Sequence, residues 1–314
     1  MQKQSMHKLI FNNSANQYSL WPGVTMDQIT NLKLNQIIND EKSGESFIFE
    51  KSAKCYLYYH VHYLEWDSTH FGYKCGTIKN FYIDDEIGFP EIDEIVKKIK
   101  PDFFQYLKTS NFKFIFADIC SQSKNGNYFI QSLRFEYILN WVDGFWSTKN
   151  RVNINPNFSV CEIRDEELEL ISNIASKYYY KGGRFYSDKR FDKVKVDKLY
   201  ESIIRNSIQN GEIILVLHEN NLPIGVFVSK KVTEYESFNK LKVAHLRFLV
   251  INESNRGINA GYNIFISTLD YLRNKCDLVV TGLESHNLVS LNLHIKMGFK
   301  FNYSHNAYHL WLTK

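Results

Sequence analysis

A turn that contains two glycines lies between two patterned segments in the last quarter of the chain. The segment from Leu246 to Ile251 is largely apolar and predicts a buried strand, and the residues from Tyr262 to Leu272 repeat with helical spacing. The turn from Arg256 to Gly261 therefore connects a strand to a helix. Gly257 and Gly261 let the main chain approach a ligand closely, and the first turn of the helix offers unpaired N–H groups and the positive end of its dipole. Such a turn favours an anion, typically a phosphate, although any tight strand–helix connection also uses glycines.

A second strand and helix follow at the spacing of a β-α-β unit. The strand is expected over Asp277 to Val280, and the next helix is expected to begin at Asn287 and to end near Gly298. Asn287 and His294 are two helical turns apart and share one face of that helix. An amide there can hydrogen-bond another amide, and an imidazole can donate a proton to a neighbouring group. Either residue alone is explained by helix capping or by partial burial, but their position downstream of the turn favours a ligand site.

This part of the chain resembles the GCN5-related N-acetyltransferase (GNAT) superfamily. In that family an Arg/Gln-x-x-Gly-x-Gly/Ala turn wraps the pyrophosphate of coenzyme A, and an Asn-led helix ends in Gly-Phe. Arg256, Gly261, Asn287 and the pair Gly298-Phe299 match that pattern. The resemblance implies acyl-CoA as co-substrate. It places the coenzyme site at Leu249, Val250, Ile251, Arg256, Gly257, Ile258, Asn259, Ala260, Gly261, Tyr262 and Asn287.

Two residues depart from the family pattern. Asn259 stands where the middle glycine is expected, and asparagine adopts left-handed backbone conformations more readily than most residues. His294 stands where the family usually has the tyrosine that protonates the departing thiolate. A histidine could serve as that acid, or the thiolate could leave unassisted.

The resemblance also implies direct attack of an acceptor amine on the thioester, without a covalent intermediate. The amine must first lose a proton, and we expect Glu284, His286 or Asp188, or a water held by one of them, to be the base. A main-chain N–H near Val250 or Ile251 would stabilise the oxyanion.

Two further segments carry aromatic and hydrogen-bonding side chains at a density suited to a base or a sugar ring. The first is LEWDSTHFGYK, and the second is GGRFYSD, which we expect in a loop between two helices. Ordinary core aromatics and a solvated loop of mixed charge are the structural alternatives. A guanidinium suits a diphosphate, and a nearby carboxylate can orient an amine. The residues expected to bind the acceptor are Trp66, Asp67, His70, Phe71, Tyr73, Arg184, Phe185 and Tyr186.

Together with the coenzyme motifs, these segments resemble the GNAT branch of dTDP-fucosamine acetyltransferase-like nucleotide-sugar N-acyltransferases. That resemblance implies a dTDP-linked amino-dideoxyhexose with its amine on C3 or C4, and an acetyl or a longer group such as 3-hydroxybutyryl. The products of such enzymes enter bacterial surface polysaccharides such as the O-antigen of lipopolysaccharide or capsule. Two alternatives remain: a tandem-GNAT aminoacyl transferase that uses charged tRNA, and a non-catalytic acyl-CoA-binding or scaffold protein.

Composition limits the remaining classes. The net charge of +4 is spread without a Lys/Arg cluster, which argues against a nucleic-acid partner. The five cysteines lie far apart and form no CxxC pair, which favours reduced thiols in the cytoplasm and argues against a metal site. No apolar run reaches the ~18 residues of a membrane span. We expect a cytoplasmic monomer or homodimer.

The chain is long enough for two domains. The polar stretch RVNINPNFSV, which contains Pro156, predicts a boundary between domains 1–152 and 153–314. Leu133-Arg134-Phe135 echoes Met297-Gly298-Phe299, which suggests a duplicated fold whose first copy has lost the coenzyme turn and contributes to the acceptor site. The predicted class is α/β (α+β), with two GNAT-like domains, each a mixed, mostly antiparallel sheet flanked by helices.

Overall fold

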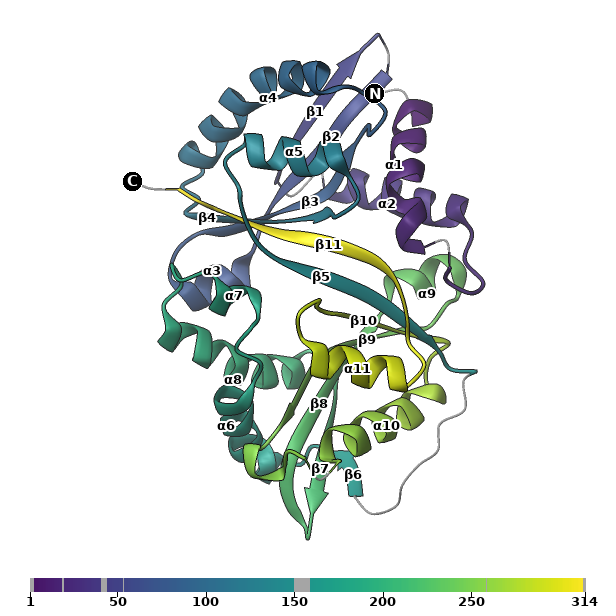
Figure 1. Cartoon of the computed structure of the whole chain (residues 1–314), viewed down its shortest axis with the longest axis vertical. Coiled ribbons are helices and arrows are strands. Elements are labelled where there is room, and N and C mark those ends of the chain that lie inside the picture. Colours follow the sequence, from purple (N-terminus) through teal and green to yellow (C-terminus); the bar gives the residue numbers. More distant parts are fainter. Residues whose placement is uncertain are drawn as a thin grey trace. The chain divides into compact units, whose positions relative to one another are not determined.

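The computed structural model describes residues 3–18, 20–40, 44–52, 54–149, 159–257 and 259–312. The chain divides into two compact units (Figure 1). Unit 1 contains the described residues up to Trp141 together with those from Asn302 onward, and unit 2 contains those from Val142 to Phe301.

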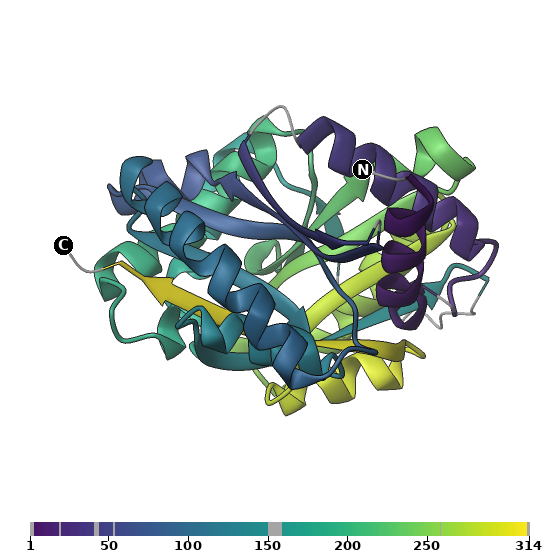
Figure 2. The ribbon, with the colours of Figure 1, turned by 90° about the horizontal axis from the view of Figure 1, so that it is seen from above.

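Unit 1 is built on a mixed sheet. Strands β1, β2 and β3 are antiparallel neighbours, β4 runs parallel to β3, and β11 pairs antiparallel with β4. Helix α4 runs along this sheet, as Figure 2 shows. The elements of unit 1 are α1 (Lys3–Tyr18), α2 (Met26–Asp40), β1 (Gly44–Lys51), β2 (Lys54–Tyr63), α3 (Glu65–Phe71), β3 (Cys75–Ile83), α4 (Phe89–Thr109), β4 (Phe114–Cys120), α5 (Lys124–Ser132) and β11 (Lys300–Trp311).

Unit 2 repeats this plan. Strands β6 to β9 are antiparallel neighbours, and β10 runs parallel to β9. Its elements are β5 (Glu136–Ser147), which enters from unit 1, β6 (Ser159–Glu162), α6 (Leu168–Tyr178), α7 (Arg184–Ser187), α8 (Lys193–Gln209), β7 (Ile213–Glu219), β8 (Leu222–Val232), α9 (Glu234–Asn239), β9 (Val243–Ile251), α10 (Ala260–Arg273), β10 (Leu278–Glu284) and α11 (Leu288–Lys296).

The duplication extends to individual residues. β3 and β9 are both nine residues long, and their side chains alternate between buried and exposed in the same order. Each makes four parallel pairs with the following strand, the last being Ile78 with Ala117 in unit 1 and Leu246 with Thr281 in unit 2. Because β4 and β10 match in length, as do α5 and α11, residues of the first copy can be assigned counterparts in the second.

Helix ends show the same correspondence. The side chain of Ser123 accepts a hydrogen bond from a main-chain N–H at the start of α5, and Asn287 does the same for α11. Arg134 and Gly298 follow these helices in the left-handed region, at φ of 67° and 87°. The echo between Leu133-Arg134-Phe135 and Met297-Gly298-Phe299 therefore marks equivalent helix ends.

Local sequence accounts for the main elements. Asn220 and Asn221, at φ of 51° and 65°, form the turn of the β7–β8 hairpin, where both central residues need positive φ. In unit 2, α10 buries Phe265 against Phe227 on one face of the sheet, and α6 buries Ile174 with Val228 on the other. In unit 1 the core includes Phe103 of α4, whose ring contacts Phe47 on β1, Tyr59 on β2 and Phe135 after α5.

The last strand departs from the predicted domain division. The proposed boundary between residues 152 and 153 lies outside the described residues. From Asn302 onward the chain belongs to unit 1, where His305 to Trp311 pair with β4, instead of staying with the second domain. In unit 2 the neighbour of β10 is β5, whose residues from Val142 belong to that unit. The strand that follows each copy's last helix thus completes the sheet of the other copy, which sequence periodicity does not reveal.

Candidate functional site

Strands β9 and β10 separate part of the way along their length. Their parallel pairing ends at Leu246 and Thr281, whereas β9 continues to Ile251 and β10 to Glu284. A β-bulge at Arg247 shifts the register between β8 and β9 just where the separation begins. A bulge bends its strand and ends regular pairing, so it explains the divergence. In its outer half, β9 therefore has a gap on the side of β10.

The main chain of Ile251 faces this gap. The N–H of Asn252 donates to Ile224 on β8, so by strand alternation the N–H of Ile251 points the other way. The same alternation turns Leu249 toward the gap, while the side chain of Val250 is buried in the core. Two of the predicted coenzyme residues, Leu249 and Ile251, thus turn their main chain toward the gap, and Val250 does not.

The turn after β9 has the backbone that the sequence predicts. Gly257 has φ of +93°, and Asn259, at φ of +61°, is the left-handed residue directly before α10. A side chain added at Gly257 or Gly261 would meet nothing within 4 Å, so the space outside the turn is open. Ile258 lies outside the described residues. Gly257 and Gly261 therefore leave room beside the turn, and a helix N-terminus carries the unpaired N–H groups and the positive dipole end that an anion favours.

Neighbouring side chains fix the turn. Nη2 of Arg256 donates to the carbonyl of Tyr178 at the end of α6, at 2.6 Å, so in this structure Arg256 anchors the turn to α6. Ala260 is buried against the core. The ring of Tyr262 lies under the ammonium of Lys296 from α11, at 4.5 Å. The amide of Asn287 serves as the helix cap of α11, next to Glu284 in the turn.

His294 is buried, and both of its ring nitrogens are engaged. Nδ1 lies 2.8 Å from the carbonyl of Ser290 and Nε2 lies 3.2 Å from the hydroxyl of Thr281. Because a carbonyl only accepts, Nδ1 carries the proton of the neutral ring and Nε2 accepts from Thr281. Burial lowers the pKa of His294 to about 4, so the ring is neutral at physiological pH. This arrangement leaves Nε2 without a proton for a leaving thiolate.

Glu284 and His286 meet the glycine pair of the second acceptor segment. Oε1 of Glu284 lies 3.2 Å from the position that a Cβ would take at Gly183, and Nε2 of His286 lies 3.2 Å from the carbonyl of Gly182. A Cβ at Gly182 would overlap the ring of Tyr180, so a larger residue here would displace that ring. Burial raises the pKa of Glu284, although His286 and Asn287 partly counteract it. A carboxylate with a raised pKa suits a general base near neutral pH.

An aromatic cluster, of which the sequence analysis named only Tyr186, lies beside Glu284. The rings of Tyr179 and Tyr200 stack at 3.6 Å, and Tyr200 stacks on Phe248 of β9 at 5.5 Å. Tyr179 and Tyr186 both donate to Oδ1 of Asp197, at 2.8 and 2.5 Å. Burial and the Asp197 hydrogen bond raise the pKa of Tyr186 to about 12, so its hydroxyl stays protonated. The cluster comes from α6, α7, α8 and β9, elements that sequence spacing does not relate.

The other residues of this segment have structural partners. Asp188 is buried and receives two side-chain hydrogen bonds from Arg190, at 2.8 and 3.0 Å. The guanidinium of Arg184 lies over the ring of Phe185 at 4.5 Å. Arg184, Phe185 and Tyr186 form the short helix α7 instead of the expected loop. Of the candidate bases, Glu284 and His286 come together, while Asp188 is held by Arg190.

The first acceptor segment lies in unit 1, mostly in helix α3. Trp66 and His70 stack one helical turn apart at 5.8 Å, and Asp67 lies in the first turn. Phe71 is buried and stacks on Tyr73. Tyr73 lines a cavity of about 640 Å³ with Gly72, and the other four predicted residues do not line it.

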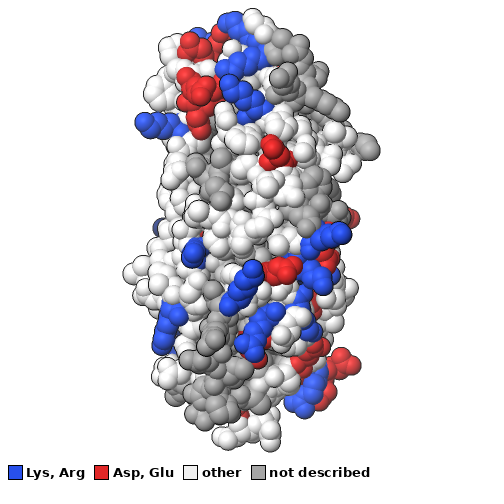
Figure 3. Space-filling model, turned by 90° about the vertical axis from the view of Figure 1, so that its right-hand side faces the viewer, with Lys and Arg blue, Asp and Glu red and all other residues white. Residues whose placement is uncertain are grey.

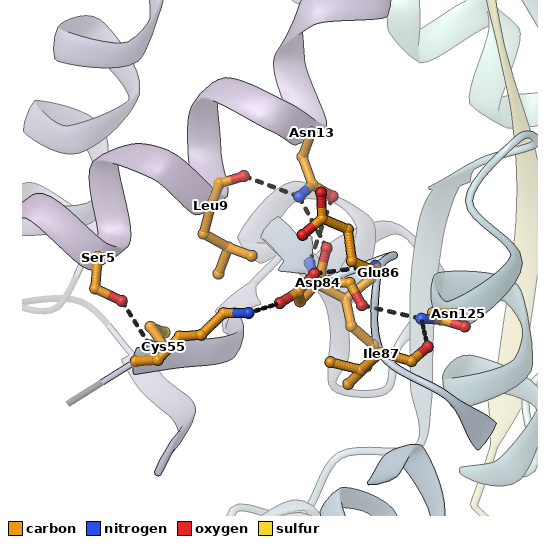
Figure 4. Close-up of polar contacts among 10 residues, drawn as sticks. Ser5, Leu9, Asn13, Cys55, Asp84, Glu86, Ile87 and Asn125 are labelled. Atoms are coloured by element: carbon orange, nitrogen blue, oxygen red, sulfur yellow. Dashed lines mark hydrogen bonds and ion pairs between the residues drawn. The ribbon is translucent and has the colours of Figure 1, made fainter. Parts of the chain in front are cut away.

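In unit 1, the counterpart of the gap is closed by the chain itself. Asn13 of α1 donates through Nδ2 to the carbonyl of Ile83 at 2.9 Å and accepts from its N–H at 3.4 Å (Figure 4). Ile83 is the counterpart of Ile251, so one side-chain amide takes both main-chain groups that in unit 2 face the gap. Asn13 lines two cavities: one of about 230 Å³ between β3, β4 and α1, and one of about 830 Å³ that is also lined by Lys54 and by the turn that follows β3.

The turn after β3 is acidic where the turn after β9 carries glycine and arginine. Asp84, Asp85 and Glu86 occupy it, and Lys54 pairs with Asp84 at 2.6 Å (Figure 4). Burial raises the pKa of Asp85, and hydrogen bonds from Ser123 and Asn125 oppose that rise. Carboxylates at this place repel a phosphate, so the first copy has lost the anion site.

Charge and metal-binding groups give no further site. Acidic and basic side chains are interspersed on the face shown in Figure 3. Within the described part of the chain, no group of three or more His, Cys, Asp and Glu residues is placed to hold a metal ion. No helix in that part is both long and apolar enough to cross a membrane.

The two units, each with a bulged strand that separates from its parallel neighbour before a helix, define a tandem GNAT fold. A tandem GNAT protein from the clavulanic acid biosynthesis pathway matches at a TM-score of 0.56 over 100% of this chain and 97% of its own, with 8% identity. A GCN5-related N-acetyltransferase from Sphaerobacter thermophilus gives 0.61 over 98% and 91%, with 7% identity. The glucosamine N-acetyltransferase region of a fungal multi-domain β-N-acetylglucosaminidase gives 0.59 over 99% of this chain and 37% of that one, with 11% identity.

No protein-family model matches the chain, and no curated protein matches it. At these identities the solved structures show the fold. They confirm the prediction of two GNAT-like units.

Proposed function

We propose that unit 2 binds acyl-CoA in the gap between β9 and β10 and transfers the acyl group to an amine. One observation carries the proposal: a side-chain amide from Asn13 fills the equivalent position at Ile83 in unit 1. The pantetheine arm of coenzyme A is a chain of amides, and Ile251 offers the same N–H and C=O pair. The coenzyme diphosphate would then lie against the N-terminus of α10.

Glu284 is the proposed base. It ends β10 at the mouth of the gap, and burial raises its pKa, so it can take a proton from an acceptor ammonium or from a bridging water. The free amine attacks the thioester carbon, the C–N bond forms and the C–S bond breaks. The N–H of Ile251 or Leu249 would stabilise the oxyanion.

Because the proton of His294 points to Ser290, the proposed mechanism assigns this residue to positioning. His294 supports Thr281, where β9 and β10 separate, and packs against Phe265 and Phe299. The departing thiolate would take its proton from solvent or from the charged nitrogen of the tetrahedral intermediate.

The acceptor is proposed to be the amine of a nucleotide-linked amino sugar, such as a dTDP-linked amino-dideoxyhexose. Tyr180 and Tyr200 border Glu284 and offer surfaces to a sugar ring. One neighbour with the same fold is described as a glucosamine N-acetyltransferase region, which is consistent with a sugar amine.

The test measures free thiol released from acetyl-CoA. The protein is incubated with acetyl-CoA and a panel that contains dTDP-linked amino sugars, free glucosamine, lysine peptides and polyamines. Release that requires both acetyl-CoA and an amino sugar supports the proposal. Thiol release with a peptide or a polyamine but with no amino sugar would refute the proposed sugar acceptor. If no thiol is released and calorimetry detects no binding of coenzyme A, the proposed acyltransferase function is refuted.

A further inference from the structure

A cysteine, a histidine and a glutamate form a chain of contacts at the edge of unit 2. Cys161 is on the edge strand β6, His218 is near the end of β7, and Glu167 ends the 3₁₀ turn before α6. Sγ of Cys161 lies 3.8 Å from Nδ1 of His218, and Nε2 of His218 lies 2.5 Å from Oε1 of Glu167. None of the three belongs to the proposed coenzyme or acceptor sites.

The contacts fix the direction of the histidine. Nη2 of Arg164 lies 2.5 Å from the same Oε1 of Glu167, and the Arg164 N–H donates to Oε2 at 3.0 Å. Although burial alone would raise it, the hydrogen bonds from Arg164 and His218 lower the pKa of Glu167 to about 2, so this group is a carboxylate. A carboxylate only accepts, so Nε2 donates to it and the lone pair of Nδ1 in the neutral ring faces the thiol.

The three side chains differ in their exposure to solvent. Glu167 and His218 are buried at 4% and 5% relative exposure, whereas Cys161 is exposed. Burial at the sulfur and the charge of Glu167 raise the pKa of the Cys161 thiol, so the resting group is protonated and its reactions need a base. A reachable thiol, a base in contact with it and a carboxylate that orients the base are the parts of an activated nucleophile.

We propose that Cys161 is a base-activated nucleophile that accepts an acyl group from a small acyl thioester. His218 removes the proton from Sγ, and the sulfur forms a bond to the acyl carbon. The C–S bond of the donor breaks, and the donor thiolate takes the proton back from His218. The acyl group remains on Cys161 as a new thioester.

The other cysteines of the chain serve as internal references. Cys55 and Cys75 are buried, and Cys120 and Cys276 are partly buried. Burial raises the pKa of Cys55 to about 12 and that of Cys276 to about 11. The structure therefore predicts that acylation is confined to Cys161.

The test treats the full-length protein with the acetyl thioester of N-acetylcysteamine at pH 7 and locates acetyl groups by peptide mass spectrometry. Acetylation of Cys161 is expected to be at least about tenfold faster than acetylation of free N-acetylcysteine, because a positioned base contributes 10²–10⁴. A slower reaction at Cys161, which a raised thiol pKa alone dictates, would overturn the proposal.

Two variants distinguish the effect of His218 as a base from the effect of exposure on the acetylation rate of Cys161. In His218→Gln the rate at Cys161 should fall about tenfold or more, and in Glu167→Gln it should fall less. Since both side chains are buried, circular dichroism and the unchanged protection of Cys55 confirm that each variant is folded. An unchanged rate in folded His218→Gln refutes the triad, and Cys161→Ser should leave amine acylation unchanged.

Discussion

Gly261→Glu is expected to stabilise the fold and to abolish coenzyme binding. Gly261 is the second residue of α10, and a Cβ there meets nothing within 4 Å. Replacing a helical glycine adds about 0.5–1 kcal/mol of stability, and a carboxylate in the first turn adds about 0.3–1 kcal/mol through the helix dipole. The sum is roughly 1–2 kcal/mol, or about 2–8 °C in Tm at 2–4 °C per kcal/mol.

The same carboxylate occupies the place proposed for the diphosphate. Two negative charges at one helix end repel each other, and the affinity for coenzyme A should fall at least about tenfold, or 1.4 kcal/mol. Val194→Glu is the matched control, because Val194 is the exposed second residue of α8 behind the capping Asp192. It should gain a similar dipole term and leave the affinity unchanged.

Calorimetric titration with coenzyme A and thermal unfolding measure the two effects. In Gly261→Glu, Tm should rise while the affinity for coenzyme A falls. Damage to the fold would instead lower both Tm and the affinity. Unchanged affinity in Gly261→Glu, or an equal loss in Val194→Glu, would refute the assignment of the turn.

Three further predictions concern the remaining groups. Glu284→Gln should lower kcat for amine acylation about 10²–10⁴-fold with unchanged coenzyme affinity. The wild-type rate should fall as pH decreases through the raised pKa of Glu284, and a variant that keeps this pH limb would contradict the role of base. The unfolded chain protonates His294 below about pH 6.5 but the folded chain only near pH 4, so stability should fall between those values and level off below. In His294→Gln the free energy of unfolding, measured with urea at pH 7.5 and at pH 4, should fall by on the order of 3 kcal/mol less than in the wild type. An equal fall in the two proteins would argue against burial of His294. Asn13→Ala should cost unit 1 about 1–3 kcal/mol, because Ile83 loses partners for both main-chain groups, while Asn12→Ala on the exposed face of the same helix should cost under about 0.5 kcal/mol; equal losses would remove Asn13 from that role.

Local sequence predicted the parts of the site that depend on adjacent residues. The turn at Gly257, the left-handed Asn259 and the helix cap Asn287 are set by backbone chemistry within a few positions, so their residue types identify them. The duplication could be inferred from a three-residue echo because Arg134 and Gly298 end equivalent helices.

What escaped prediction depends on contacts between distant segments. Nothing near His294 in sequence shows that Thr281, on the preceding strand β10, holds its Nε2. Helix α1 is rich in Asn, Gln and Ser and lacks a clear apolar stripe, so neither the helix nor the role of Asn13 was predicted. The stacking of Tyr179 with Tyr200 joins α6 and α8 and becomes visible only in three dimensions.

The placement of β11 has a consequence for how the protein is made. Unit 1 contains the described residues up to Trp141, yet the strand that pairs with β4 follows the whole of unit 2 in the chain. During translation β4 is therefore an exposed sheet edge, open to unwanted pairing, until unit 2 and β11 have been synthesised. Deletion of His305 to Trp311 should then impair unit 1, the half of the molecule that was synthesised first.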